Sequence, residues 1–295
     1  MPFVLKNFDT TQYIGKKIQH FINDELGFSV AESQRLVCKG RVFDNKQNRL
    51  QMSQSIKSDF IQIALFEGVS RGLKPLFVTN DFAFFDKPSG VMVHPTSRNT
   101  QYSLLDEIRY HFGENANLGH RIDQETSGLV LITRNKYSDM ILKEMFENKE
   151  YQKEYLAVVD GKIDSTLTIE EPLARDLQSS IGVKMKVTID GKYSKTVIEP
   201  ISYDPIKNQT LIKALPLTGR QHQIRVHLNY IGHTIIGDPI YGIDEKYADM
   251  YLCKTLDDET RIKITKHHRL MLHSNKLHFR YQGIEFKINS KLTLV

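Results

Sequence analysis

The chain has 295 residues, 40% of them hydrophobic and 25% charged, which is the composition of a globular protein large enough to bury a core. Its net charge of +5 permits a polyanionic partner but does not require one, so a role in binding nucleic acid has to be argued from local clusters. The two cysteines, Cys38 and Cys253, exclude a disulfide scaffold and a cysteine-based zinc site, and no apolar run approaches the roughly 18 residues of a membrane span.

Residues 1–70 predict a small α/β domain. Apolar residues recur at helical spacing over residues 11–26, and Ser29 and Glu32 have the spacing of a capping box that begins a second helix. Short strand candidates follow that helix. We therefore place a first domain at residues 1–70 and a second domain at residues 71–295.

Basic residues are spread along the predicted helices of the first domain, where they would contact phosphates, because cations displace counterions from RNA. These candidate contacts are Lys16, Lys17, Arg35, Lys39, Arg41 and Lys46. Two short helices followed by a Lys-Gly-Arg-Val-x-x-Asn turn resemble the S4 RNA-binding module. Ala31 and Glu32 stand where that module usually has a basic residue. A basic-faced domain with no RNA role is the alternative.

The second domain begins with two predicted strands, at residues 76–78 and 82–85, followed by a Lys-Pro-x-Gly turn that starts at Lys87. We assign this turn to scaffolding, because its proline fixes φ and its glycine is permissive. A helix is expected over residues 103–112. A later helix around residues 140–146 has an apolar face that we assign to the core.

The most informative stretch is His120-Arg-Ile-Asp-Gln-Glu-Thr-Ser-Gly128, which leads directly into an apolar run at residues 129–132. The run is typical of a buried strand, and loops held by such strands often display reactive groups. Asp123 is the candidate acid, and Arg121 beside it could meet a phosphate or a developing negative charge. An ordinary solvated loop is the alternative.

Residues 153–159 predict an extended segment that contains Tyr155. A strand tyrosine is usually a core or edge residue, but its ring could stack on a base and its oxygen could take part in proton transfer. The mixed charges of residues 170–193 predict a hairpin or an insertion.

A second polar motif, Thr-Gly-Arg-Gln-His-Gln-Ile-Arg-Val-His-Leu, covers residues 218–228. Its apolar residues recur at helical spacing, and Arg220 and His222 stand at the predicted helix start, which is a natural anion site. Zinc is another interpretation of His222 and His227. They are five positions apart, not the four that place two ligands on one helix face, so we expect no metal.

Together these motifs resemble those of the RluA-type pseudouridine synthases, which carry His-Arg-Ile-Asp-x-x-Thr-Ser-Gly-Leu, Lys-x-Tyr-x-Ala and Thr-Gly-Arg-x-His-Gln-Ile-Arg-x-His. The resemblance implies that Asp123 is the catalytic residue, Tyr155 the active-site tyrosine and Arg225 the arginine that pairs with the aspartate. Arg121 would fill the gap left when the target base leaves its helix. The implied fold is α+β, with a mixed, largely antiparallel sheet, preceded here by the S4-like domain.

The resemblance implies an isomerase that converts specific uridines in RNA to pseudouridine. We expect no cofactor, because the reaction has no net redox change and the chain shows neither a P-loop nor a dinucleotide fingerprint. An S4-like module with this catalytic type resembles the members that act on large-subunit ribosomal RNA. Transfer RNA is the alternative target, and a non-catalytic RNA-binding or ribosome-assembly factor is the alternative from another class.

The residues leave open whether the aspartate attacks the base or acts at the sugar. We expect a monomer with no membrane association. A cytoplasmic location is expected, since residues 1–5 lack the basic-then-apolar pattern of a signal peptide.

Overall fold

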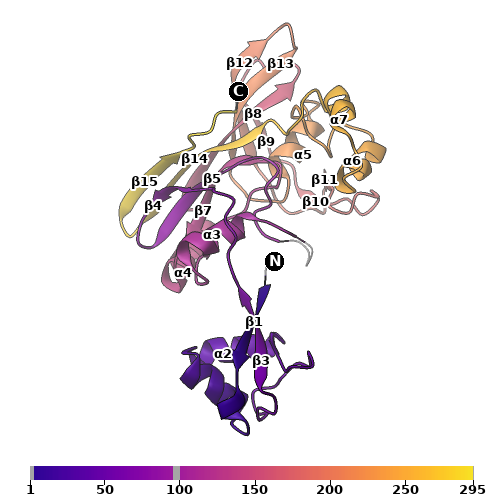
Figure 1. Ribbon diagram of the computed structural model, residues 1–295. Helices are drawn as coiled ribbons and strands as arrows, with labels where there is room; N and C mark the ends of the chain where they lie inside the picture. The colour runs from indigo at the N-terminus through magenta and orange to yellow at the C-terminus, as the bar shows by residue number, and fades with distance from the viewer. Residues whose placement is uncertain (1–2, 96–99, 295) are drawn as a thin grey trace. The chain divides into compact units, whose positions relative to one another are not determined.

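The computed structural model describes residues 3–95 and 100–294 (Figure 1). The chain divides into two compact units, one formed by residues 1–70 with 96–101 and the other by residues 71–95 with 102–295. In the described ranges, no helix is both long and apolar enough to cross a membrane. Both cysteines are free and exposed.

The first unit folds helical segments against a small antiparallel sheet. The sheet order is β1 (Phe3–Asp9), β3 (Phe60–Phe66) and β2 (Val42–Phe43). Helix α2 (Val30–Cys38) begins at the predicted capping box, which is confirmed: the side chains of Ser29 and Glu32 each accept a hydrogen bond from the other's backbone N–H. The Glu32 carboxylate therefore caps the start of α2 and is a structural group.

The predicted α-helix over residues 11–26 is wrong in its first half, where only a short 3-10 helix, η1 (Thr11–Tyr13), forms. The α-helix α1 spans only Ile18–His20 and continues into a helical turn, η2, at Phe21–Glu25. Gly15 has a φ of +91°, outside the helical region, and Ile14 is 58% exposed. Ile14, the first apolar residue of the helical pattern, therefore does not pack into the core, whereas the later ones, from Ile18 on, do.

The second unit is built on a sheet in which ten strands of the described chain take part. The main path runs in the order β4 (Pro75–Val78), β5 (Phe82–Lys87), β7 (Ser127–Thr133), β14 (Leu272–Tyr281), β8 (Tyr151–Asp160), β13 (Gln209–Pro216), β12 (Thr196–Asp204) and β9 (Leu167–Ile169). Strand β15 (Ile284–Asn289) pairs with β14, and β6 (Asn117–Leu118) pairs with β7. Strands β7 and β14 are parallel and the other pairs are antiparallel. The predicted α+β class with a mixed, largely antiparallel sheet is confirmed.

Helices cover both faces of the sheet around β5 and β7. Alternate residues of these strands pack against α4 (Lys136–Glu147) on one face and α3 (Leu104–Phe112) on the other. Because both faces are covered, β7 is buried along its whole length, which explains its continuous apolar run. The assignment of Met140 of α4 to the core is wrong, since this side chain is 61% exposed.

The segment from residue 170 to 193 contains the predicted hairpin, formed by β10 (Leu173–Arg175) and β11 (Met185–Val187). Its buried residues share a cluster with residues of α5 (Gln223–Tyr230) and α6 (Glu245–Leu252). Helix α7 (Asp258–Thr265) follows α6. Figure 1 shows these helices and the hairpin gathered at one end of the sheet.

Gly128 fixes the start of β7 against β14. Its φ is +102°, and a Cβ atom there would lie 2.2 Å from the carbonyl oxygen of Ser274. A larger residue would need both a strained backbone and a shift of β14. The glycine therefore lets the loop that carries Asp123 enter the sheet beside β14.

Candidate active site

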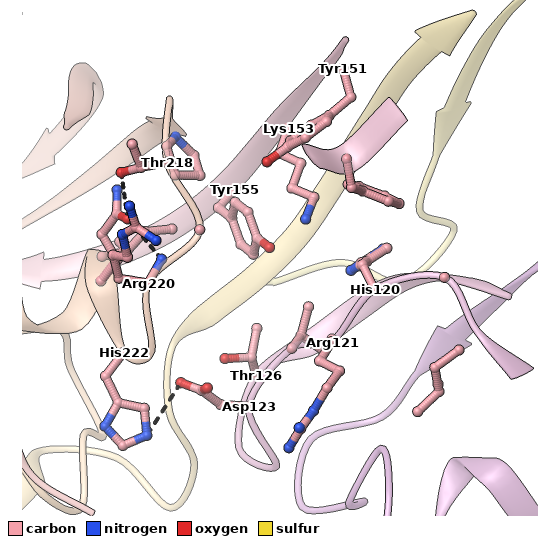
Figure 2. Close-up of a pocket in the computed structure, with 18 of the residues that line it drawn as sticks. His120, Arg121, Asp123, Thr126, Tyr151, Lys153, Tyr155, Thr218, Arg220 and His222 are labelled. Atoms are coloured by element: carbon pink, nitrogen blue, oxygen red, sulfur yellow. Dashed lines mark hydrogen bonds and ion pairs between the residues drawn. The ribbon is translucent and has the colours of Figure 1, made fainter. Parts of the chain in front are cut away.

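A pocket of about 800 Å³ lies on the second unit and contains the polar motifs found in the sequence (Figure 2). Its walls come mainly from the loop before β7, from β8 and from the segment that leads into α5. The candidate site residues from the second unit all line it: Arg121, Asp123, Tyr155, Arg220, His222 and Arg225.

A buried network of ions orients Asp123. Nη1 of Arg225 donates to Oδ2 of Asp123 at 3.1 Å, while its Nε and Nη2 donate to the two oxygens of Asp238 at 2.7 and 2.8 Å. The Arg225 and Asp238 side chains are 3% and 1% exposed, whereas Asp123 is 27% exposed. The bidentate pair with Asp238 thus fixes the guanidinium plane and directs the remaining donor to Asp123. The predicted pairing of Arg225 with Asp123 is confirmed.

Asp238 was given no role from the sequence. It lies in the Gly-Asp-Pro step after the second motif, and its Oδ1 also accepts the backbone N–H groups of Ile240 and Tyr241, at 2.9 and 3.1 Å. An aspartate between a glycine and a proline favours such a turn, and this was the available signal. The sequence did not show that Asp238 would bind Arg225, because this contact depends on the turn lying beside α5.

The pocket keeps the Asp123 carboxylate ionised. Burial would raise its pKa, but the neighbouring His222 and Arg225 groups lower the pKa below its ordinary value of 3.8. Burial, together with Arg225, lowers the pKa of His222 to about 4. Since His222 is therefore neutral near pH 7, Arg225 is the cation that acts on Asp123 there.

The hydrogen bonds of His222 define its neutral form. The Tyr241 hydroxyl accepts the backbone N–H of Met185 at 3.0 Å and lies 2.9 Å from Nδ1 of His222. The arrangement that satisfies all three groups has Tyr241 donate its proton to Nδ1, which leaves the imidazole proton on Nε2. Nε2 faces Oδ2 of Asp123 at 3.9 Å, as the dashed line in Figure 2 marks.

The loop that carries Asp123 is held just after the aspartate. Nζ of Lys87, a fully buried side chain, donates to the carbonyl oxygens of Gln124 and Pro88 at 2.8 and 2.9 Å. Burial lowers the pKa of Lys87 to about 7, against the opposing effect of nearby carboxylates. These contacts agree with the scaffolding role predicted for the Lys-Pro-x-Gly turn.

Glu125 provides a second anchor for this loop, which the sequence analysis missed. Its buried carboxylate accepts from the Tyr251 hydroxyl of α6 and from Nη2 of Arg261 of α7, the latter at 2.7 Å. The arginine lies 5.0 Å from the centroid of the Tyr251 ring. Because both partners are more than 120 positions away in the sequence, local spacing gave no indication of them.

Tyr155 lies on β8 and is 7% exposed, and its hydroxyl points into the pocket in Figure 2. Burial raises its pKa above the ordinary value of 10.0, and the charge of Asp123 acts in the same direction. The phenol is therefore protonated at neutral pH and presents a hydroxyl and a ring, not a phenolate.

Internal hydrogen bonds already occupy polar groups of the segment before α5, which was predicted to be an anion site. Oε1 of Gln223 accepts from the Thr218 hydroxyl at 2.7 Å and from the backbone N–H of Arg220 at 3.0 Å. His222, with a φ of +54°, precedes the first helical residue. Because the Arg220 N–H is occupied, an anion here would meet the Arg220 side chain, which is exposed, and not its backbone.

His227 is a structural residue and does not line the pocket. Its Nδ1 lies 2.9 Å from the Thr196 hydroxyl and its Nε2 lies 3.0 Å from the carbonyl oxygen of Glu171. Both ring nitrogens are thus engaged, so His227 does not form a ligand pair with His222. No group of three or more metal-binding side chains occurs in residues 3–95 and 100–294.

The candidate RNA contacts of the first domain belong to the first unit and do not line this pocket. Lys16, Arg35 and Lys39 are exposed. Arg41 is partly buried, and its guanidinium lies 4.0 Å from the centroid of the Phe3 ring. Lys17 and Lys46 are exposed as well.

A pocket in which a buried arginine orients an ionised aspartate, with a protonated tyrosine nearby, defines a candidate acid–base or nucleophilic site. The family model of the RNA pseudouridylate synthases matches residues 81–230, which include all three groups. The chain therefore belongs to the RNA pseudouridylate synthase family. It is an enzyme that isomerises uridine to pseudouridine in RNA.

Similar proteins agree with this assignment. An uncharacterized RNA pseudouridine synthase of Helicobacter pylori is 36% identical over 294 residues, which cover 99% of this chain and 95% of that protein. The mitochondrial tRNA pseudouridine(32) synthase of Saccharomyces cerevisiae is 35% identical over 61% of this chain and 39% of its own length. Ribosomal large subunit pseudouridine synthase D of Zymomonas mobilis is 34% identical over 59% of this chain and 57% of its own.

A solved structure shows the same fold. Human RNA pseudouridylate synthase domain containing 1 superimposes with a TM-score of 0.61 at 23% identity, covering 76% of this chain and 85% of that one.

Proposed function

We propose that this enzyme modifies specific uridines of large-subunit ribosomal RNA, with Asp123 as the catalytic carboxylate and no cofactor. The observation that carries the proposal is the directed contact from Arg225 to Asp123, made inside a pocket with Tyr155. The reaction breaks the N1–C1′ bond, turns the base and forms a C5–C1′ bond. An ionised carboxylate can attack the base or act at the sugar, and both routes use the same arrangement.

The other pocket residues serve the substrate. The Tyr155 ring would stack on the released uracil, and its hydroxyl would assist removal of the C5 proton. Arg121 is exposed beside the aspartate, so it would fill the space that the target nucleotide leaves in its helix. Arg220 and His222 would contact the sugar and phosphate of the same nucleotide.

The ribosomal target draws support from the resemblance of residues 1–70 to the S4 module and from the Zymomonas relative. The yeast relative supports transfer RNA as the second candidate. Pseudouridine mapping in a strain without this protein tests the choice. Loss of a site in large-subunit ribosomal RNA, restored by the wild-type gene but not by Asp123→Asn, is expected; loss confined to transfer RNA would favour the second candidate. We further propose a cytoplasmic monomer.

The first domain should contribute affinity and not chemistry. Replacing Lys16, Arg35 and Lys39 with glutamine is expected to weaken RNA binding and to flatten the dependence of log Kd on log salt by up to about two units, since each lost phosphate contact on single-stranded RNA contributes about 0.7. Turnover at saturating RNA should stay near that of the wild type, because no proposed catalytic residue changes. Binding measured across a salt series, with single-turnover rates, checks both parts.

A matched control removes the same charge elsewhere. Lys143, Lys162 and Lys266 are exposed lysines of the second unit that already pair with carboxylates. Their replacement with glutamine should change the salt slope little. An unaltered slope in the first variant would contradict RNA contact by the first domain.

A further inference from the structure

Lys153 is a cation in the pocket to which the proposed chemistry assigns no role. It stands two residues before Tyr155 on β8, and because side chains alternate along a strand, the two share a face. Both line the pocket, and in Figure 2 the Lys153 ammonium group points into it, as the Tyr155 hydroxyl does.

Two aromatic rings surround the Lys153 ammonium group, and no carboxylate of the described residues pairs with it. Its Nζ lies 4.8 Å from the centroid of the Phe146 ring and 4.9 Å from that of the Tyr151 ring. Within residues 3–95 and 100–294, Lys153 forms no ion pair with a carboxylate. The rings favour a cation at their faces but screen it from water. Burial lowers the pKa of Lys153 to about 8, so it is mostly protonated at neutral pH.

The isomerisation places negative charge on the base by either route. Heterolysis of N1–C1′ leaves the bonding electron pair with uracil, and attack by a carboxylate on the base also pushes an electron pair into the ring. In both routes the charge is shared with the carbonyl oxygens. It is lost once the C5–C1′ bond has formed, C5 has released its proton and N1 has gained one, with no change in oxidation state.

We propose that Lys153 is a further catalytic residue, whose ammonium group stabilises the negative charge on a uracil carbonyl oxygen during isomerisation. A preorganised cation at the position where charge develops is among the strongest contributions that an active site makes. This proposal rests on the proposed function of the pocket. A lysine between rings, next to a tyrosine that would stack on the base, suits the base better than a hydrated phosphate.

The test compares Lys153→Met with Lys276→Met. Lys276 lies on the neighbouring strand β14, where it faces Glu154 in the register, and does not line the pocket, so the control removes the same charge. Single-turnover rates at saturating RNA should fall roughly 10²-fold in Lys153→Met and remain unchanged in the control. The Kd for RNA should stay within about threefold in both variants, because the charge on the base is absent from the ground state.

The dependence of the rate on pH gives a second readout. The protonated ammonium is the active form, so the wild-type rate should fall as the pH rises through about 8. Lys153→Arg keeps a cation, so it should regain part of the rate and move this decline to higher pH. The other titratable and charged groups that line the pocket are His94, His120, Arg121, Asp123, Glu147, Lys149, Tyr151, Tyr155, Arg220, His222 and Arg225. Burial keeps His120 neutral, and the raised pKa values of both tyrosines keep them neutral too.

Three outcomes would overturn the proposal. If Lys153→Met keeps its rate but binds RNA more weakly with a flatter salt slope, Lys153 is a phosphate contact. If neither the rate nor the affinity of Lys153→Met changes, Lys153 has no role in the reaction. A decline of the rate with rising pH that is the same in Lys153→Arg as in the wild type would also contradict the proposal. Asp123→Asn separates this from the proposed function: an active Asp123→Asn rejects that function, whereas an inactive one beside a fully active Lys153→Met rejects only the role of Lys153.

Discussion

Replacing Asp123 with asparagine should abolish turnover while leaving the affinity for RNA within a few-fold of the wild type. The substitution removes the nucleophilic or charge-bearing oxygen but little contact surface, so the loss lies in the barrier. We expect a rate decrease of at least roughly 10³-fold, about 4 kcal/mol. Pseudouridine formation under single-turnover conditions measures the loss, and filter binding measures the affinity.

The pKa of Asp123 adds a condition to this experiment. Because the pKa is lowered below its ordinary value of 3.8, the carboxylate stays ionised as the pH falls toward that value, and its contribution is lost only below it. The wild-type rate should therefore show no decline due to Asp123 between about pH 5 and 7. Asp164→Asn is the control, since Asp164 is an exposed carboxylate paired with Lys162. A residual rate above about a tenth in Asp123→Asn would remove this residue from the mechanism.

Arg225→Met should reduce both stability and activity. The substitution leaves the buried Asp238 carboxylate without its guanidinium, and breaking a buried ion pair costs roughly 3–5 kcal/mol. The melting temperature should fall by roughly 10 °C for a unit of this size. The rate should fall because Asp123 loses its orienting donor and its pKa rises. Calorimetry and single-turnover kinetics on the same preparation check the two effects.

A double variant separates these effects. In Arg225→Met with Asp238→Asn, no buried carboxylate is left unpaired, while an oxygen remains for the backbone N–H groups of Ile240 and Tyr241. Part of the stability should return without the activity, because Asp123 still lacks its partner. If activity returned together with stability, Arg225 would be a structural residue only. Arg225→Lys should stay impaired, since an ammonium group cannot make the bidentate contact.

The sequence predicted the strands and the reactive loop because both depend on local patterns. The buried run of β7 and the capping box of α2 are signals that lie within a few residues of each other. Likewise, the candidate site residues of the second unit could be gathered from two short motifs and one tyrosine. The resemblance to a family supplied their pairing, and the structure brings them into one pocket.

The remaining features depend on contacts between distant parts of the chain. The partners of Glu125 come from α6 and α7, and the tautomer of His222 depends on Tyr241 and Met185. Lys153 is the first residue of the Lys-x-Tyr-x-Ala motif, but the rings of Phe146 and Tyr151 that surround its ammonium group could not be predicted from the motif. The predicted helix at residues 11–17 was wrong for the opposite reason. The local helical spacing was present, but Ile14 has no core surface to pack against.

The position of β14 has a consequence for how the enzyme matures. This strand lies between β7 and β8 and carries Ser274, which meets Gly128 across the parallel pair. During synthesis the loop with Asp123 emerges about 150 residues before its neighbour on β14, so the edges of β7 and β8 that pair with β14 have no partner strand until then. Such edges attract other chains. The sheet behind the active centre is therefore complete only once β14 has inserted between β7 and β8, and pairing at such a sequence separation is expected to slow folding.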